Sequence, residues 1–117
     1  MQLFDYLRSR WSPRSRAMWL YRRGMIKAKL HDQKSAIADY TAVIEIDDAP
    51  ADVRAIALFN RSVVFSTNHD DTAATRDLEQ LLQMAGASGN VRTEAQRKLV
   101  RMRRASERPE HGHITSE

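Results

Sequence analysis

Apolar residues recur at intervals of three and four along most of the chain, which is the spacing of one face of an α-helix. Met18, Tyr21 and Met25 follow this spacing near the start, and Val91 and Ala95 follow it near the end. Only three prolines and four glycines interrupt the 117 residues, which favours long helices over many short strands. The pattern predicts an all-α fold with helices at about 13–30, 33–46, 51–67, 71–84 and 91–105.

Local signals mark the ends of these helices. Ser12 followed by Pro13 is a typical N-cap and first helical position, and Asp32 is a good N-cap for the second helix. The segment GASGN before the fifth helix has the composition of a loop. Residues 107–117 have little to bury, so we expect a disordered tail there.

The chain is expected to contain one domain, at residues 13–106, because its length supplies a single modest core. Residues 1–12 precede it as an N-terminal segment. Phe4, Leu7 and Trp11 stand at helical spacing in this segment, so it is a candidate capping helix for the open end of the domain.

Two parts of the chain carry similar residues at a constant interval of 38. The pairs are Leu20 and Leu58, Gly24 and Ser62, His31 and His69, Asp32 and Asp70, Ala36 and Ala74, Asp39 and Asp77, Tyr40 and Leu78, and Ile44 and Leu82. Small residues at 24 and 62 allow the two helices of a hairpin to approach closely, and larger ones at 40 and 78 fill the space between hairpins. A single hairpin cannot bury both of its faces, so we expect the two to stack.

These residues resemble a known repeat. The stretch RRGMIKAKLHDQKSAIADYTAVIEIDD resembles a tetratricopeptide repeat, and LFNRSVVFSTNHDDTAATRDLEQLL resembles a second, more divergent one. The resemblance covers roughly residues 14–84 and implies antiparallel hairpins stacked as a short right-handed superhelix, with the fifth helix as a C-terminal cap. The family's usual period is about 34 residues. We expect the extra residues of this longer period in DDAPADVRA, as an extended start of the third helix or a longer linker.

The resemblance also implies a function, because tetratricopeptide arrays generally bind a peptide or a helix in a concave groove lined by the first helix of each hairpin. Apolar groove residues suit an apolar anchor of a partner protein, and Arg22 with Lys29 suits a carboxylate. The alternative is that the apolar residues pack against a neighbouring helix or the N-terminal segment. By position, the groove residues are Tyr21, Arg22, Met25, Lys29, Ile56, Phe59, Asn60, Val63 and Thr67.

Some members of the family hold a C-terminal carboxylate in a clamp of lysine and asparagine side chains. Asn60 matches one element of that clamp, but Tyr21 and Met25 stand where lysine and asparagine are needed. The resemblance therefore implies a protein-interaction module or scaffold without this particular specificity.

The charge distribution leaves two other interpretations open. Residues 1–29 carry a net charge of +7, residues 30–90 carry −6, and residues 91–117 carry +3. The basic ends favour nucleic-acid or ribosome binding, with Trp11 available to stack on a base, although the apolar groove argues against base reading. The third interpretation is self-association, as a homodimer in which a basic end meets the acidic middle.

Catalysis is not expected, since the sequence contains no GxSxG, HExxH, P-loop or GxGxxG motif. His31 and His69 are explained by the repeat, and the HxH of His111 and His113 is too sparse for a metal site, so we expect neither a metal nor a cofactor. No apolar run reaches the ~20 residues that span a bilayer, and no membrane partner is expected. The absence of cysteine fits the reducing cytoplasm better than an oxidising compartment, and the arginine-rich start resembles a mitochondrial presequence only faintly.

Overall fold

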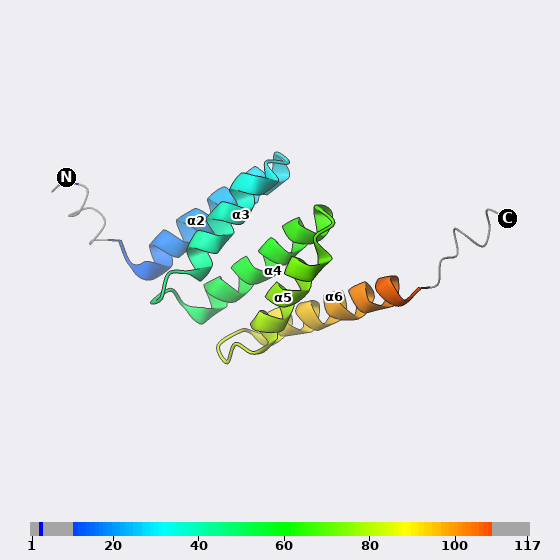
Figure 1. Cartoon of the computed structure of the whole chain (residues 1–117). Helices are drawn as coiled ribbons and strands as arrows, with labels where there is room; N and C mark the ends of the chain where they lie inside the picture. The colour runs from blue at the N-terminus through cyan, green and yellow to red at the C-terminus, as the bar shows by residue number, and fades with distance from the viewer. Residues whose placement is uncertain (1–2, 4–10, 109–117) are drawn as a thin grey trace.

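The computed structural model describes Leu3 and residues 11–108, and in this part of the chain it contains five α-helices and no strand (Figure 1). The expected all-α fold is confirmed. None of these five helices is both long and apolar enough to cross a membrane. The helices are α2 (Pro13–Lys29), α3 (Gln33–Ile44), α4 (Ala51–Thr67), α5 (Asp71–Leu82) and α6 (Gly89–Glu107).

Five helix ends differ from the sequence prediction, and the smallest difference is at α2, which ends one residue earlier than expected, at Lys29. The second helices, α3 and α5, end two residues earlier than expected, at Ile44 and Leu82. Helix α6 begins at Gly89, within the expected GASGN loop, because the side chain of Ser88 accepts a hydrogen bond from the backbone N–H of Val91. Its last residue is Glu107, so the helix extends into the expected tail.

Two predictions lie outside the described residues. The capping role of residues 1–12 depends on Phe4 and Leu7, and only Leu3, Trp11 and Ser12 of that segment are described. The disorder expected for the tail falls mainly on residues 109–117, which are also outside.

Each hairpin closes through the same short turn. His31 has a positive φ of 61°, its N–H donates to the carbonyl of Ala28, and the N–H of Asp32 donates to the carbonyl of Lys27. This pair of bonds is the Schellman ending of a helix, which most often uses glycine because the left-handed backbone crowds a Cβ atom. His69 repeats the turn with a φ of 63°. The following aspartate caps the next helix, so the turn ends one helix and starts another.

The interval that relates the two hairpins governs the whole described array. Helices α2, α4 and α6 begin at residues 13, 51 and 89, and α3 and α5 begin at residues 33 and 71. Helix α4 has 17 residues, the same number as α2, so the extended start predicted for the third helix is not found. The interval of 38 residues separates α2 from α4 and also α4 from α6, so the two hairpins and the linkers that follow them have the same lengths. Helix α6 therefore occupies the position of the first helix of a third hairpin.

The helices pack in a regular order. Helix α2 pairs with α3, and α4 pairs with α5; α4 also contacts α3 and α2, and α6 contacts α5 and α4 (Figure 1). Among the described residues, α3 and α5 make no close backbone approach. The first helices therefore form one connected layer, whereas the second helices stand apart.

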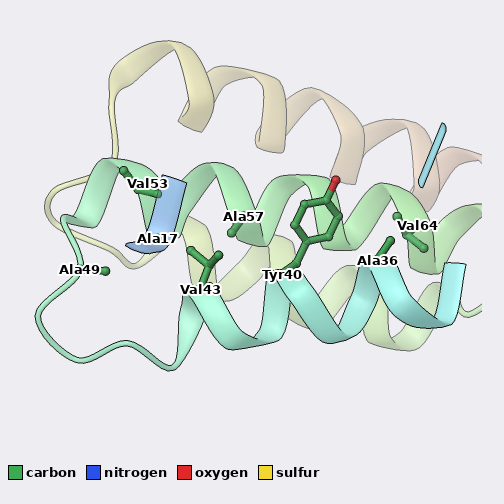
Figure 2. Close-up of a cluster of buried hydrophobic side chains, with 8 residues drawn as sticks. All are labelled: Ala17, Ala36, Tyr40, Val43, Ala49, Val53, Ala57 and Val64. Atoms are coloured by element: carbon green, nitrogen blue, oxygen red, sulfur yellow. The ribbon is translucent and has the colours of Figure 1, made fainter. Parts of the chain in front are cut away.

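The core has two clusters, one around the first hairpin and one around the second. Figure 2 shows the first cluster, in which the ring of Tyr40 lies among small side chains of α2, α3 and α4. Helix α2 approaches this ring through Gly24, where a Cβ atom would lie 2.8 Å from Tyr40 Cε1. The second hairpin has Ser62 and Leu78 at the corresponding positions, and both side chains are buried. A larger residue at 62 than at 24 thus accompanies a smaller residue at 78 than at 40.

Candidate functional site

The nine residues assigned to the groove form two rows, one on α2 and one on α4. The rows correspond at the interval of 38, so that Tyr21 matches Phe59 and Met25 matches Val63. None of the nine is fully buried. The exposed ones are Arg22, Lys29, Val63 and Thr67, and the half-buried ones are Tyr21, Met25, Ile56, Phe59 and Asn60.

Asn60 joins the two rows. Its Nδ2 donates a hydrogen bond of 3.1 Å to the hydroxyl of Tyr21 and another of 2.8 Å to the backbone carbonyl of Ile56. Both amide protons are therefore used within the array, and the carbonyl oxygen of the side chain is the part that remains for a ligand. This link between the two hairpins was not predicted, because the sequence contains no signal that pairs an asparagine with a particular tyrosine.

The two tyrosines of the first hairpin are held mostly by packing. The ring centroids of Tyr21 and Tyr40 lie 5.9 Å apart at an angle of 46°. Burial raises the pKa of Tyr21, and the hydrogen bond from Asn60 acts in the opposite direction. Burial also raises the pKa of Tyr40 to about 12, with smaller contributions from Tyr21 and Asp39. Both side chains are thus neutral at physiological pH and present an apolar body with a polar tip.

A hollow of about 170 Å³ lies between α4 and α6. Its lining is Ile56, Phe59, Asn60, Asn90, Val91 and Glu94. The first three were predicted as groove residues. The last three belong to α6, which the sequence analysis assigned only a capping role. The available signal was the repeat interval itself, because Glu94 follows Ile56 by one full interval.

Helix α6 continues the rows with a different chemistry. The residues that correspond to Phe59, Asn60 and Val63 are Arg97, Lys98 and Arg101, in that order. Burial lowers the pKa of Lys98, and Arg101 lowers it further, while Asp71 acts in the opposite direction. The row on α6 is therefore basic, whereas the row on α4 carries no charge and the row on α2 combines apolar and basic residues.

Each hairpin also contains an ion pair, at corresponding positions. Arg23 donates to Asp39 through Nε and Nη2, at 2.9 and 2.8 Å, and Lys27 Nζ lies 3.2 Å from the same carboxylate. In the second hairpin, Arg61 donates to Asp77 at 2.8 and 2.7 Å. Both carboxylates are buried beside their partners, so these pairs connect the helices of a hairpin and are not available to a ligand.

The Asp39 pair predicts how stability depends on pH. The hydrogen bonds from Arg23 hold the pKa of Asp39 below its usual 3.8, Lys27 lowers it further, and burial opposes both. A depressed pKa in the folded state means that the unfolded chain binds the proton first. This contribution to stability is therefore present above the unfolded pKa and is lost as the pH falls through the folded value.

We expect the free energy of unfolding of the wild-type chain to fall more steeply below about pH 4 than that of Asp39→Asn. The measurement is urea denaturation followed by circular dichroism between about pH 6 and about pH 2. Lys34→Gln is the control, because this exposed lysine does not bond to the carboxylate. Parallel curves for the wild type and Asp39→Asn would contradict the assignment.

The described residues provide no metal centre, because no three histidine, aspartate or glutamate side chains within residues 11–108 gather closely enough to hold an ion. His31 and His69 lie in the exposed turns that close the two hairpins. His111 and His113 are outside the described part.

Of the nine predicted residues, Ile56, Phe59 and Asn60 line the hollow against α6, and Asn60 bonds to Tyr21. Arg22 lines a different hollow, beside Trp11 and Trp19. Comparison with protein-family models, with curated proteins and with solved structures finds no match for the chain.

Proposed function

We propose that the chain is a non-catalytic interaction module, similar to a short tetratricopeptide array with a right-handed superhelical stack. Two hairpins in strict register support this interpretation, and so does α6, which starts in the same register. Helices α2 and α4 contact each other, as do α4 and α6, whereas α3 and α5 stand apart, which supports an array that bends with the first helices on its inner side. The groove of the proposed module lies on that inner side.

The observation that carries the proposal is the hollow between α4 and α6. Its floor is made by Ile56 and Phe59, which suit an apolar side chain of a partner. Lys98 and Arg101 lie farther along α6 and suit a carboxylate. We infer a peptide or helix of a partner protein that combines an apolar anchor with acidic residues.

Nucleic-acid binding is the second candidate, and the basic residues of α6 favour it. Five of them stand between Arg97 and Arg104, which is enough for contact with phosphates but provides no means of reading bases. Such binding would weaken steeply with salt, whereas seating an apolar anchor would not.

The test is a selection of peptides from a random library displayed on phage, using the full chain as bait. Dissociation constants of the recovered peptides are then measured by fluorescence anisotropy. We expect Ile56→Asp to weaken binding by about tenfold or more, because a charge would be desolvated against the apolar anchor in the hollow.

The matched control is Gln80→Asp, which adds the same charge at an exposed position of α5. It should change the dissociation constant by no more than about twofold. Peptides that bind both variants equally would place the binding surface elsewhere. A salt-steep association with a single-stranded RNA probe, with no peptide recovered, would favour the second candidate.

A further inference from the structure

Helix α2 leaves exposed a face whose counterpart on α4 is buried. On α4, three apolar side chains pack against the first hairpin with exposed fractions of 5% or less (Figure 2). They are Val53, Ala57 and Val64. The corresponding residues of α2, one repeat interval earlier, are Ser15, Trp19 and Ile26. Trp19 is 49% exposed and Ile26 is 58% exposed, so α2 presents a helix-packing face without a helix on it among the described residues.

We call Ser15, Trp19 and Ile26, together with Trp11, the open face of α2. It includes a hollow of about 420 Å³ beside Trp11 and Trp19, whose rings meet edge to face at 6.1 Å. Arginines 14 and 22 line the same hollow. Helix α2 carries six basic residues and no acidic one. Four of the six pair with aspartates of α3, α4 and the linker between them, whereas Arg22 and Lys29 make no ion pair among the described residues and leave unpaired positive charge on α2.

A second, independent observation concerns a guanidinium group. Arg61 of α4 uses Nε and Nη2 for Asp77, and its Nη1 donates a 2.8 Å hydrogen bond to Oγ1 of Thr41 on the preceding helix, α3. Arg23 is the corresponding residue of α2. It binds Asp39 through the same two atoms, but within residues 11–108 its Nη1 has no acceptor. Its side chain is 43% exposed, against 17% for Arg61.

The comparison defines what a helix on the open face must provide. Trp19 of α2 stands at the position that Ala57 has on α4. Because Trp19 is much larger than Ala57, a helix that packs on it needs a small apolar residue where α3 has larger ones. Arg23 needs a hydroxyl or carboxylate oxygen at the place of Thr41. Arg22 makes no ion pair among the described residues, so a carboxylate of the partner helix could pair with it.

We propose that the open face of α2 docks an acidic amphipathic helix of a partner protein, in the place that α3 takes against α4. A second copy of α2 is disfavoured as the occupant, because its own arginines would meet those of the first copy. Arg22 borders both the groove and this face, but Ser15, Trp19 and Ile26 do not belong to the groove, so the inference goes beyond the function proposed above.

The chain's two tryptophans, Trp11 and Trp19, both line the open face, so intrinsic fluorescence reports on this surface alone. The probe is a synthetic peptide of residues 31–48 of this chain with Tyr40→Ala. It copies α3, contains no tryptophan, carries five acidic residues and one lysine, and places a small residue opposite Trp19. Titration of the full chain should shift the tryptophan emission to shorter wavelength and reduce quenching by acrylamide.

Two variants with the same change of charge sharpen the test. Ile26→Glu should weaken binding of the peptide by about tenfold or more, since a carboxylate would be buried in the contact. Leu30→Glu should change it by about twofold at most. Leu30 is 72% exposed, and its counterpart on α4, Asn68, is exposed too, so it lies off the packing face.

Four results would overturn the proposal. Tryptophans already shielded in a particle of twice the monomer mass, measured by light scattering, would assign the face to a second copy. Shielding in a monomer that disappears when residues 1–10 are deleted would assign it to the chain's own N-terminal segment. Exposed tryptophans that do not respond to the peptide, or a peptide that binds Ile26→Glu as tightly as the wild type, would show that no acidic helix docks there.

Discussion

Replacing Asp77 with alanine is expected to lower the free energy of unfolding by about 3 kcal/mol. The carboxylate is 3% exposed and receives two hydrogen bonds from Arg61, which is itself 17% exposed. Without Asp77, the guanidinium stays in a place that water reaches poorly, and only Thr41 remains as its acceptor. A buried charge without its partner is costly, although replacing both members of such a pair by apolar residues can be nearly neutral.

Urea denaturation of the full chain, followed by circular dichroism at neutral pH, measures this loss. The matched variant is Asp39→Ala in the first hairpin. Arg23 is 43% exposed, so water can solvate it after the carboxylate is removed, and the expected loss is smaller. Equal losses in the two hairpins would mean that exposure of the arginine does not determine the cost.

Gly24→Ala is expected to lower the free energy of unfolding by about 2 kcal/mol, despite the better helix propensity of alanine. The added Cβ would lie 2.8 Å from Tyr40 Cε1 and 3.0 Å from Cδ1. The tyrosine is 1% exposed and cannot move aside without disturbing the first core cluster. Overpacking of this kind forces side chains from their preferred rotamers.

The second hairpin suggests the compensating change. It has Ser62 and Leu78 where the first has Gly24 and Tyr40, so the double variant Gly24→Ser, Tyr40→Leu should be more stable than the sum of its single variants predicts. A coupling of about 1 kcal/mol or more is expected from a double-mutant cycle. Gly89→Ala is the control, because a Cβ there meets nothing within 4 Å, and it should not destabilise the chain.

The sequence predicted the first four helices well because their signals are local. Aspartates 32 and 70 are strong N-caps, and the apolar residues that follow them keep the helical spacing. The sequence indicated a small residue at 24 for close helix approach and a large one at 40 between hairpins, but the direct packing of Tyr40 against Gly24 is seen only in the structure. Periodicity and capping together were sufficient for the all-α fold.

The role of α6 was predicted only in part, for a physical reason. Helix α6 begins 38 residues after α4, as the repeat interval requires, but its residues differ in type from those of α2 and α4. Leu99, for example, stands where α2 and α4 have Arg23 and Arg61. Among the described residues no second helix follows α6, and Leu99 is buried in the second core cluster instead of pairing with a carboxylate. The recurring residue pairs therefore end at Ile44 and Leu82, and residue types alone give no sign that Asn90, Val91 and Glu94 belong to the site.

Arg92 shows what spacing cannot predict. Its guanidinium donates to the backbone carbonyls of Leu82, Met84 and Ala87, which closes the end of α5 and the linker to α6. Arg16 and Arg54 hold the same register positions on α2 and α4, yet neither makes these bonds among the described residues. Every residue has a backbone carbonyl, so the sequence does not indicate which carbonyls an arginine will bind. Such a contact can be recognised only in the three-dimensional structure.

The equal spacing of the three first helices makes residues 51–88 a cassette. The segment begins with the first residue of α4 and ends with Ser88, the N-cap of α6, so its two ends occupy equivalent places in the array. A second copy of this segment, inserted in tandem, would join through a linker of the kind already present. Each such insertion would add one helix to the layer of first helices. It would lengthen any groove on that layer by the width of one hairpin.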